Sequence, residues 1–276
     1  SFEKGQCPPT LMKYPYFCVN AFTKNSYSGN PAGVCILQEW LSTDELQKMA
    51  TQVHLPETAF LFPSPNGAWS IRWFSPLVEI DLCGHAALAA AHVLYQEGFA
   101  SDKDTITFSS SAGNLKVQKR GKQSVALEMP AISYRKSSIS PLLVEGLGSY
   151  PDQVYVGMDC LCVFSEEERI EALNPDFRIL SGIRNCRGII VTAATENAGY
   201  DFISRFFGPR VGIDEDQVTG SSHCMLAPYW ASKLKKNSLI GWQASQRGGE
   251  VYCELKGDRV ILIGKSETFL RGEVEF

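Results

Sequence analysis

The apolar positions of the chain recur mostly with the period of β-strands, and this pattern dominates the first half. Runs rich in Val, Ile, Phe, Trp and Cys between turn residues predict strands. These runs are residues 14–21, 32–37, 58–62, 69–74, 105–110, 114–118 and 124–129. The last three follow one another at regular spacing, which is typical of an antiparallel meander. A helix is expected between Ser42 or Thr43, as the cap, and Pro56, because apolar residues recur there at helical spacing.

Two helical runs interrupt this β-rich pattern. Residues 82–95 contain five alanines and no charged side chain, which predicts a helix buried on nearly all faces. Residues 219–230 have the same plan, since a small polar residue, a glycine and another polar residue precede a mostly apolar run. The first backbone N–H groups of a helix lack intrahelical partners. The helix starts at Gly84 and Gly220 are therefore candidate anion sites.

The second half repeats the outline of the first more loosely. Strands are predicted at residues 153–164, 188–194 and 200–207 and through the strand-rich tail 241–276, and helices at 141–147 and 165–173, the latter capped at Ser165. Residues 208–218 predict a loop. The similar junctions before the two glycine-opened helices indicate an α+β fold of two related lobes, residues 12–130 and 131–276. Each lobe is expected to place a curved, mostly antiparallel sheet around one central helix, and the last strand could return to the first lobe.

Composition and charge narrow the classes of function. The 276 residues are 44% hydrophobic, enough for a large core. The net charge is −4, the pI is about 5.7 and there is no polybasic run, so we expect neither a nucleic-acid partner nor a membrane partner. No apolar segment reaches the roughly 18 residues of a membrane span. Residues 1–11 lack the apolar core of a signal peptide and are interpreted as a leader or added residues.

Cysteine usage indicates the redox compartment. The nine cysteines are odd in number and scattered, which favours free thiols in a reducing, cytoplasmic compartment over a disulfide framework. Cys160 and Cys162 have the closest spacing. Their strand-like surroundings predict two thiols on one face of a sheet.

Several side chains that could carry chemistry also have ordinary structural explanations. Glu57 is presented where an apolar strand emerges from a loop, yet most glutamates at strand ends are merely solvated. His54 and His223 are expected to be a surface residue and a satisfied helix residue. The glycines at 146 and 148 lack the strand, third glycine and helix of a dinucleotide fingerprint, so no nucleotide cofactor is expected.

A metal site is one possible reading of the first glycine-opened helix. Cys83, His85 and His92 have the side chains of metal ligands. However, His92 lies seven residues beyond His85 on the same helix, or about 10.5 Å at roughly 1.5 Å per residue. The two imidazoles cannot share one ion, and we expect no metal.

Motifs along the chain share their order and spacing with one known family. They are Asn20-Ala21-Phe22 with Gly29-Asn30-Pro31-Ala32, Leu55-Pro56-Glu57-Thr58-Ala59-Phe60, Arg72-Trp73-Phe74-Ser75-Pro76 through Leu82-Cys83-Gly84-His85-Ala86, Asp216-Gln217-Val218-Thr219-Gly220-Ser221, and Arg247-Gly248-Gly249-Glu250. From about Met12 to the C-terminus, the chain resembles the phenazine biosynthesis PhzF-like family, whose fold is shared with diaminopimelate epimerase. The resemblance implies two similar lobes with the active site in the cleft between them.

The resemblance also assigns candidate site residues one by one. The family's catalytic glutamate, histidine and aspartate fall on Glu57, His85 and Asp216, and its serine falls on Ser221. Substrate-binding positions are expected at Gly84, Gly220, Ser221, Asn30 and Arg247. For Arg247, a solvated arginine in an ordinary turn explains the sequence equally well. Gln217 stands where the family commonly has proline and Ser222 where it has alanine, so loop rigidity and substrate fit could differ.

The chemistry implied by the resemblance is proton transfer without a cofactor. The member that gives the family its name moves a proton within a cyclic dihydro-hydroxyanthranilate without metal or nucleotide. One carboxylate in a dry cleft can remove a proton from carbon and return it to another carbon on the same face, and Glu57 is the candidate. The expected partner is a small anionic substrate. A homodimer is also expected, since family members are often dimers.

Two other classes of function stay open. A racemase or epimerase on the same fold needs a thiol on each side of the substrate carbon, but the residue before Gly220 is Thr219, whereas Cys83 stands before Gly84. Cys224 lies inside the helix, where packing is the better explanation. A binding protein that kept the scaffold without activity is the second alternative, because a fold does not by itself fix activity.

Overall fold

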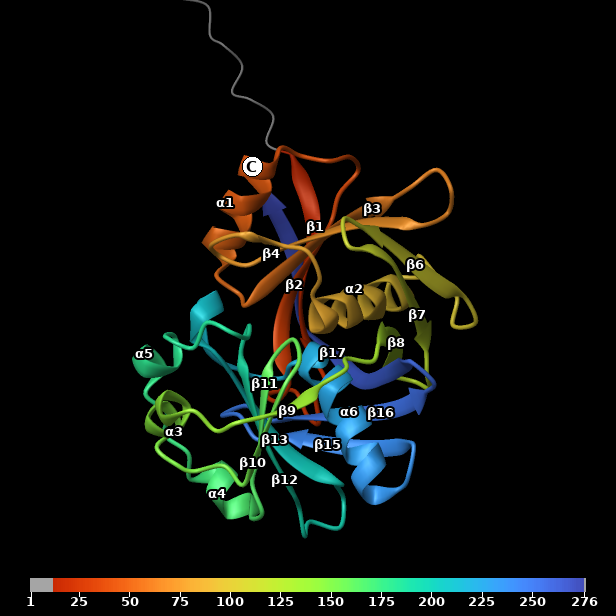
Figure 1. The fold of residues 1–276 in the computed structure, drawn as a ribbon. Helices are drawn as coiled ribbons and strands as arrows, with labels where there is room; N and C mark the ends of the chain where they lie inside the picture. The colour runs from red at the N-terminus through yellow and green to blue at the C-terminus, as the bar shows by residue number, and fades with distance from the viewer. Residues whose placement is uncertain (1–11, 276) are drawn as a thin grey trace, which may run out of the picture.

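The computed structural model describes residues 12–275, and Figure 1 shows their arrangement. The expected leader, residues 1–11, lies outside this range. The fold is mixed α+β, rich in strands and poor in helices, and its strands form one continuous hydrogen-bonded network. No helix among the described residues is long and apolar enough to cross a bilayer.

The first half of the described chain wraps its strands around helix α2. Its helices are α1 (Thr43–Val53) and α2 (Gly84–Gln96). Its strands are β1 (Lys13–Ala21), β2 (Asn30–Ile36), β3 (Glu57–Pro63), β4 (Trp69–Phe74), β5 (Glu79–Ile80), β6 (Thr105–Ser110), β7 (Gly113–Lys119) and β8 (Ser124–Pro130). Helix α2 contacts β1, β2, β3, β7 and β8, and its residues from Ala86 to Ala91 are fully buried. The charge-free sequence thus forms a buried central helix.

The second half surrounds helix α6 (Gly220–Leu234) less completely. Its other helices are α3 (Pro141–Leu147), α4 (Glu167–Glu171), α5 (Phe177–Leu180) and the 3-10 turn η1 (Pro209–Val211). Its strands are β9 (Arg135–Ser137), β10 (Gln153–Val156), β11 (Cys160–Val163), β12 (Ile189–Ala194), β13 (Phe202–Gly208), β14 (Ile213–Asp216), β15 (Ser238–Gln243), β16 (Gly249–Lys256) and β17 (Arg259–Glu275). Helix α6 packs on β15, β16 and β17.

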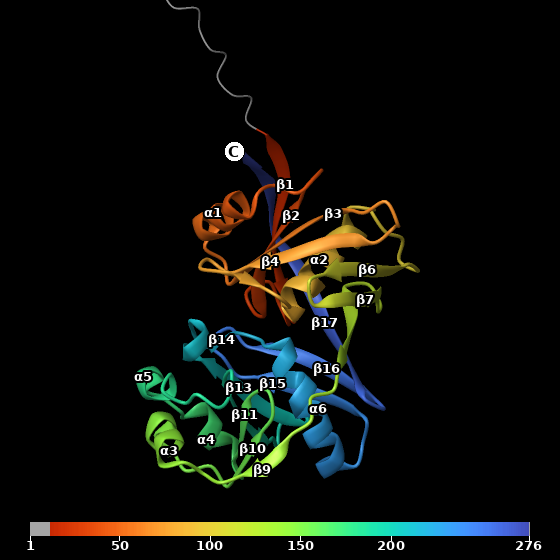
Figure 2. The same cartoon turned by 45° about the horizontal axis from the view of Figure 1, so that its top comes forward.

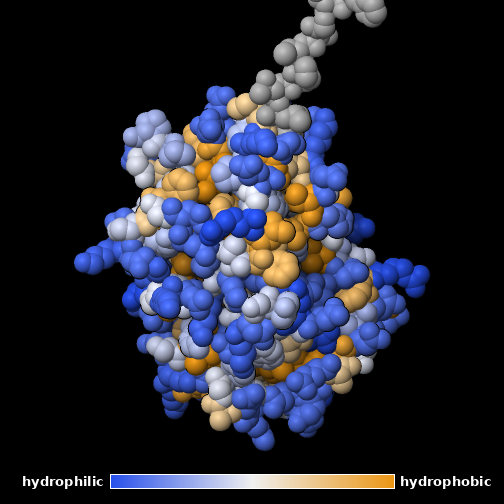
Figure 3. Space-filling view, turned by 180° about the vertical axis from the view of Figure 1, so that it is seen from behind, coloured by the Kyte–Doolittle hydropathy of each residue, from blue (hydrophilic) through white to orange (hydrophobic). Residues whose placement is uncertain are grey.

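Strand β17 connects the two groups of elements. Its first part pairs with β16 and with β8, and its residues from Ser266 onward pair with β1. Figure 2 shows this strand running from the group around α6 into the group around α2. Seen from behind in Figure 3, hydrophilic side chains cover most of the surface, with apolar side chains gathered near its centre.

Several predicted boundaries were wrong, each for a local reason. The predicted loop 208–218 contains η1 and β14, because Ile213–Asp216 pairs with β13 despite its acidic sequence. The strands predicted over 153–164 are confirmed as β10 and β11, whereas the strand-rich tail begins at Ser238 and not at Gly241. Ser165 does not cap α4, because the helix begins at Glu167 and the N-cap position is Glu166. The predicted cap of α1 is confirmed, because Ser42 and Glu45 form a reciprocal capping box.

The prediction of free thiols is confirmed for the described chain, whereas the cytoplasmic compartment stays a prediction. All eight described cysteines carry free thiols. Cys160 and Cys162 lie on β11 with their Sγ atoms 4.0 Å apart, as expected for alternate positions of one strand.

Candidate active site

The starts of α2 and α6 meet at two glycines. A Cβ atom placed on Gly84 would lie 3.7 Å from the Cα of Gly220, and the reverse distance is the same. The residues at the N-cap positions, Cys83 and Thr219, make no side-chain capping hydrogen bond. Two helix N-termini with uncapped first turns therefore lie against each other, which is a favourable place for negative charge.

Glu57 and His85 form a buried acid–base pair beside these helix starts. Glu57 is the first residue of β3, and His85 is the second residue of α2. Glu57 Oε2 lies 3.1 Å from His85 Nε2, and both side chains are buried. The two atoms are not aligned as a hydrogen bond, and neither has another hydrogen-bond partner among the described residues. Buried polar atoms are nearly always hydrogen-bonded, so these two are available to a ligand.

Asn30 connects the pair to Asp216. Asn30 Nδ2 donates to Asp216 Oδ1 at 2.7 Å and to the Val218 carbonyl at 3.0 Å. It also lies 3.2 Å from His85 Nδ1. Because Asn30 opens β2 and Asp216 ends β14, this amide joins the first half of the chain to the second. Thr219 Oγ1 completes the network by donating to Asp216 Oδ2 at 2.6 Å.

The electrostatics of the cluster follow from burial and from the short distances. Burial alone lowers the pKa of His85, but the facing Cys83 and Glu57 outweigh it and raise this pKa well above its usual range. Burial raises the pKa of Asp216, and nearby Glu57 adds to the shift while His85 opposes it. Burial also raises the pKa of the Cys83 thiol. The burial of Cys83 fits a small packed residue better than an accessible nucleophile.

Two predicted binding residues have partners within the protein. Ser221, in the first turn of α6, accepts a hydrogen bond from Arg187 Nη2 at 2.9 Å. The Arg247 guanidinium donates from Nε to the Gly29 carbonyl at 2.8 Å and from Nη2 to Asn20 Oδ1 at 2.9 Å. Arg247 thus holds the loop that precedes Asn30, and its contact with a substrate stays a prediction.

Sequence reasoning missed Arg187, Asp159 and Gln243. Arg187 binds Asp159 in a bidentate pair, and Gln243 accepts from the Thr219 N–H while donating to the Asp216 carbonyl. All three are distant in sequence from the residues they support. Only the pairing of strands brings them to the start of α6.

Three ligand-capable side chains come together at the pair. Glu57, Cys83 and His85 offer atoms within 4.8 Å of one another, so they are a possible metal-ligand set. However, Glu57 contacts Nε2 of the imidazole, whereas Cys83 Sγ lies 3.5 Å from Nδ1. One imidazole presents one nitrogen to a given ion, and the two contacts use different nitrogens, so the absence of a metal stays a prediction. His54 is exposed, as predicted. His223 is buried and bonds the Thr219 carbonyl through Nδ1, but its Nε2 has no hydrogen-bond partner among the described residues, so the prediction of a fully satisfied histidine was wrong.

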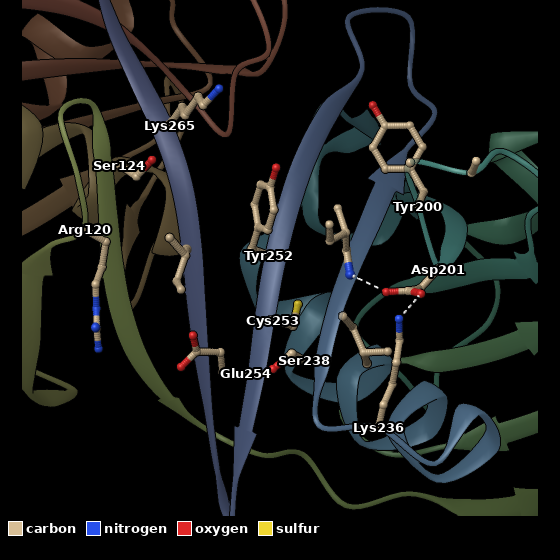
Figure 4. Close-up of a pocket in the computed structure, with 15 residues that line it drawn as sticks. Arg120, Ser124, Tyr200, Asp201, Lys236, Ser238, Tyr252, Cys253, Glu254 and Lys265 are labelled. Carbon is tan, nitrogen blue, oxygen red and sulfur yellow. Dashed lines mark hydrogen bonds and ion pairs between the residues drawn. The ribbon is translucent and has the colours of Figure 1, made fainter.

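A separate hollow of about 510 Å³ lies on the outer side of β15, β16 and β17 (Figure 4). Its lining residues include Arg120, Tyr252 and Lys265 but none of the predicted site residues. Its acid Asp201 is paired with Lys236 and accepts from the Ile240 N–H. The hollow is therefore distinct from the cluster around Glu57.

Comparisons with known proteins identify the family of the chain. The chain matches the family described as phenazine biosynthesis-like protein over residues 19–272. An uncharacterized isomerase from Halalkalibacterium halodurans is 44% identical over 268 residues, with 96% of this chain and 99% of that protein covered. A crystal structure of a PhzF-family phenazine biosynthesis protein from Enterococcus faecalis superposes with a TM-score of 0.91 at 39% identity, covering 95% of this chain and 99% of that one.

A more distant structure shows the fold alone. A hydroxyproline epimerase from Agrobacterium vitis, crystallised with trans-4-hydroxy-L-proline, superposes with a TM-score of 0.61 at 10% identity. The superposition covers 96% of this chain and 93% of that one.

Proposed function

The chain belongs to the phenazine biosynthesis-like protein family and is an isomerase, and from this premise we propose that it moves a proton within a small carboxylate without a cofactor. Glu57 is proposed as the general acid and base. The observation that carries the proposal is the buried contact between Glu57 and His85, whose facing atoms lack hydrogen-bond partners among residues 12–275. A group that exchanges protons with a substrate must have its reactive atom free before the substrate arrives.

The proposed reaction has two balanced steps. Glu57 as carboxylate removes a proton from an acidic carbon of the substrate and becomes a carboxylic acid, leaving an enolate-like anion. The same acid then returns this proton to another carbon, so the substrate is isomerised and Glu57 is restored. His85 is proposed to remain protonated beside the Glu57 carboxylate, because its raised pKa favours the imidazolium cation.

The meeting of two helix starts supports an anionic substrate. The intermediate carries negative charge, and backbone N–H groups at Gly84 and Gly220 are proposed to stabilise it together with the substrate carboxylate. The site would lie between lobes of residues 12–130 and 131–276, each with a sheet around its central helix. The contact from Asn30 to Asp216 supports this position. A homodimer and a cytoplasmic location remain predictions from the resemblance and from the cysteines.

A two-base racemase is less well supported by the contacts. The residue that holds the equivalent position at the second helix start is Thr219, and its hydroxyl donates to Asp216. Cys224 is buried in α6, with Sγ 3.7 Å from the Gly220 carbonyl oxygen. Neither residue offers a second carbon base at neutral pH.

Deuterium exchange tests the proposed function. A cyclic dihydro-hydroxyanthranilate is incubated with the enzyme in deuterated buffer, and incorporation at carbon is followed by NMR. We expect exchange with the wild type and a loss of at least about 100-fold in Glu57→Gln, because a general base contributes roughly 10²- to 10⁴-fold. Glu128→Gln, which alters a surface ion pair with Arg259, serves as the control.

The result also separates an enzyme from a binding protein. Exchange that persists in Glu57→Gln would contradict the assignment of the base. Absence of Glu57-dependent exchange with this compound and with a panel of amino-acid-like carboxylates would favour the non-catalytic binding protein.

A further inference from the structure

An ion pair between a half-buried arginine and a buried aspartate lies beside the first turn of α6. Asp159 is fully buried, and Arg187 binds both of its oxygens, from Nε at 3.0 Å and from Nη2 at 2.7 Å. The guanidinium also lies over the ring of Phe206, with its central carbon 5.4 Å from the ring centroid. A bidentate arginine stacked on an aromatic ring has little freedom to turn. Asp159 and Phe206 therefore fix the direction in which Arg187 points its remaining N–H groups.

One of these N–H groups points at Ser221. Arg187 Nη2 carries two hydrogens, and the one that is not given to Asp159 is donated to Ser221 Oγ at 2.9 Å. The serine oxygen is thus an acceptor, while its own hydrogen has no acceptor among residues 12–275. The hydroxyl of the next residue, Ser222, already has an acceptor for its hydrogen. It donates to the Thr219 carbonyl at 2.8 Å, the local bond that serines in helices commonly make.

The position of Ser221 places its hydroxyl hydrogen near the junction of the two helix starts. Ser221 follows Gly220, the residue that abuts Gly84 where the two helix starts meet. It is partly exposed, in a first turn that has no side-chain cap. A hydroxyl whose oxygen already accepts from a cation is a stronger donor to a further acceptor, since chains of hydrogen bonds polarise one another.

We propose that Arg187, held by Asp159, is a positioning residue that makes Ser221 a hydrogen-bond donor to the anionic group of the substrate. The proposal rests on the proposed function in one respect, namely that a carboxylate binds at the start of α6. Because Asp159 balances the charge of Arg187, the pair adds orientation to the site without adding net charge. The substrate class is therefore set by the helix starts and by a donor hydroxyl, and Arg187 acts through Ser221.

Binding of hydroxyanthranilate, measured by isothermal titration calorimetry, tests the proposal. Removing only Arg187 would leave Asp159 buried and unpaired, which is strongly destabilising. The pair is therefore removed together as Asp159→Asn with Arg187→Gln. We expect the Kd to rise about tenfold in this double variant, about tenfold in Ser221→Ala, and still only about tenfold when all three changes are combined. Arg169→Gln is the matched control, because Arg169 pairs with Asp152 and lies over the ring of Phe164.

The combined variant separates an action through Ser221 from a general structural effect. Independent effects would multiply to about a hundredfold weaker binding and would overturn the proposal. Unchanged affinity in the Asp159→Asn, Arg187→Gln variant, or no binding of hydroxyanthranilate by the wild type, would also overturn it. Failure of the proposed function is a different result. Wild type that binds the probe with this non-additive pattern but exchanges no deuterium would contradict only the proton transfer.

Discussion

At the scale of single residues, the charge state of His85 makes a prediction about pH. Its pKa is raised on folding, since Cys83 and Glu57 outweigh the opposing effect of burial. A histidine with a raised pKa contributes stability that is fully present below its unfolded pKa of about 6.5 and is lost as the pH rises through the folded value. We therefore expect wild type to lose part of its stability advantage over His85→Gln as the pH rises above about 6.5. Urea unfolding of both proteins measures this.

Removing the partner of His85 provides the control for this prediction. In Glu57→Gln, one source of the raised pKa is gone, so the pH dependence of the free energy of unfolding should become weaker. A stability advantage that instead grows as the pH rises would mean that burial lowers the pKa of His85 by more than Cys83 and Glu57 raise it. His85 would then be neutral in the folded protein.

The residues of the cluster differ in how far the sequence could predict them. Glu57, His85, Asp216 and Asn30 lie in motifs with a recognisable order, and the structure brings all four into one network. The pair of Asp159 and Arg187 has no such signal. Asp159 lies between β10 and β11, inside a region predicted as strands, and an aspartate there is usually solvated, yet its side chain is fully buried.

At the scale of elements, the sequence could predict helix α2 but not strand β14. Helix α2 was predictable, because a run without charge can lie only inside the protein. Strand β14 was not, since three of its four residues are acidic and strand propensity is low for aspartate. Its side chains are stabilised by Arg205 of the neighbouring strand β13, which pairs with Glu215, and by Asn30 of the first half of the chain, which donates to Asp216.

The turn before β2 gives a prediction at this scale. Gly29 has a φ of +78°, and a Cβ atom there would lie 2.4 Å from the Ala21 carbonyl oxygen. Gly29→Ala is expected to destabilise the protein by about 3 kcal/mol or more, from backbone strain and steric overlap together. Because Asn30 follows directly, proton exchange by the remaining folded protein should fall as well. Urea unfolding and the deuterium assay measure the two effects.

Gly98 is the matched control for Gly29. Its φ of +77° is nearly the same, but no atom of the described residues lies within 4 Å of the position that a Cβ would occupy there. Gly98→Ala should therefore cost only about 1 kcal/mol, the strain of the backbone angle alone. Equal losses in the two variants would show that the close approach of Gly29 to Ala21 adds nothing.

At the scale of the whole molecule, β17 determines whether the two groups of elements unfold together. The strand pairs with β16 and β8 and then with β1, so it shares hydrogen bonds with both groups. At Gly264 it passes over Phe22 and over Leu88 of α2. The ring of Phe22 also lies beside Gly220 at the start of α6. The sequence predicted strands in this tail but not a single strand of this length, because its partners are spread over the whole chain.

A substitution at this crossing point tests the coupling of α2 to α6. A Cβ atom on Gly264 would lie 2.4 Å from Phe22 Cδ1 and 3.1 Å from Leu88 Cδ2, so Gly264→Ala should cost about 1–3 kcal/mol through overpacking. If the molecule unfolds as one unit, hydrogen exchange will show this loss in the most protected amides of both helices. Gly272→Ala on the same strand, where the nearest atom is 4.0 Å away, should leave both unchanged. Loss of protection in α2 alone would mean that each helix and its sheet open independently, and that the contact between Gly84 and Gly220 does not hold the two groups together.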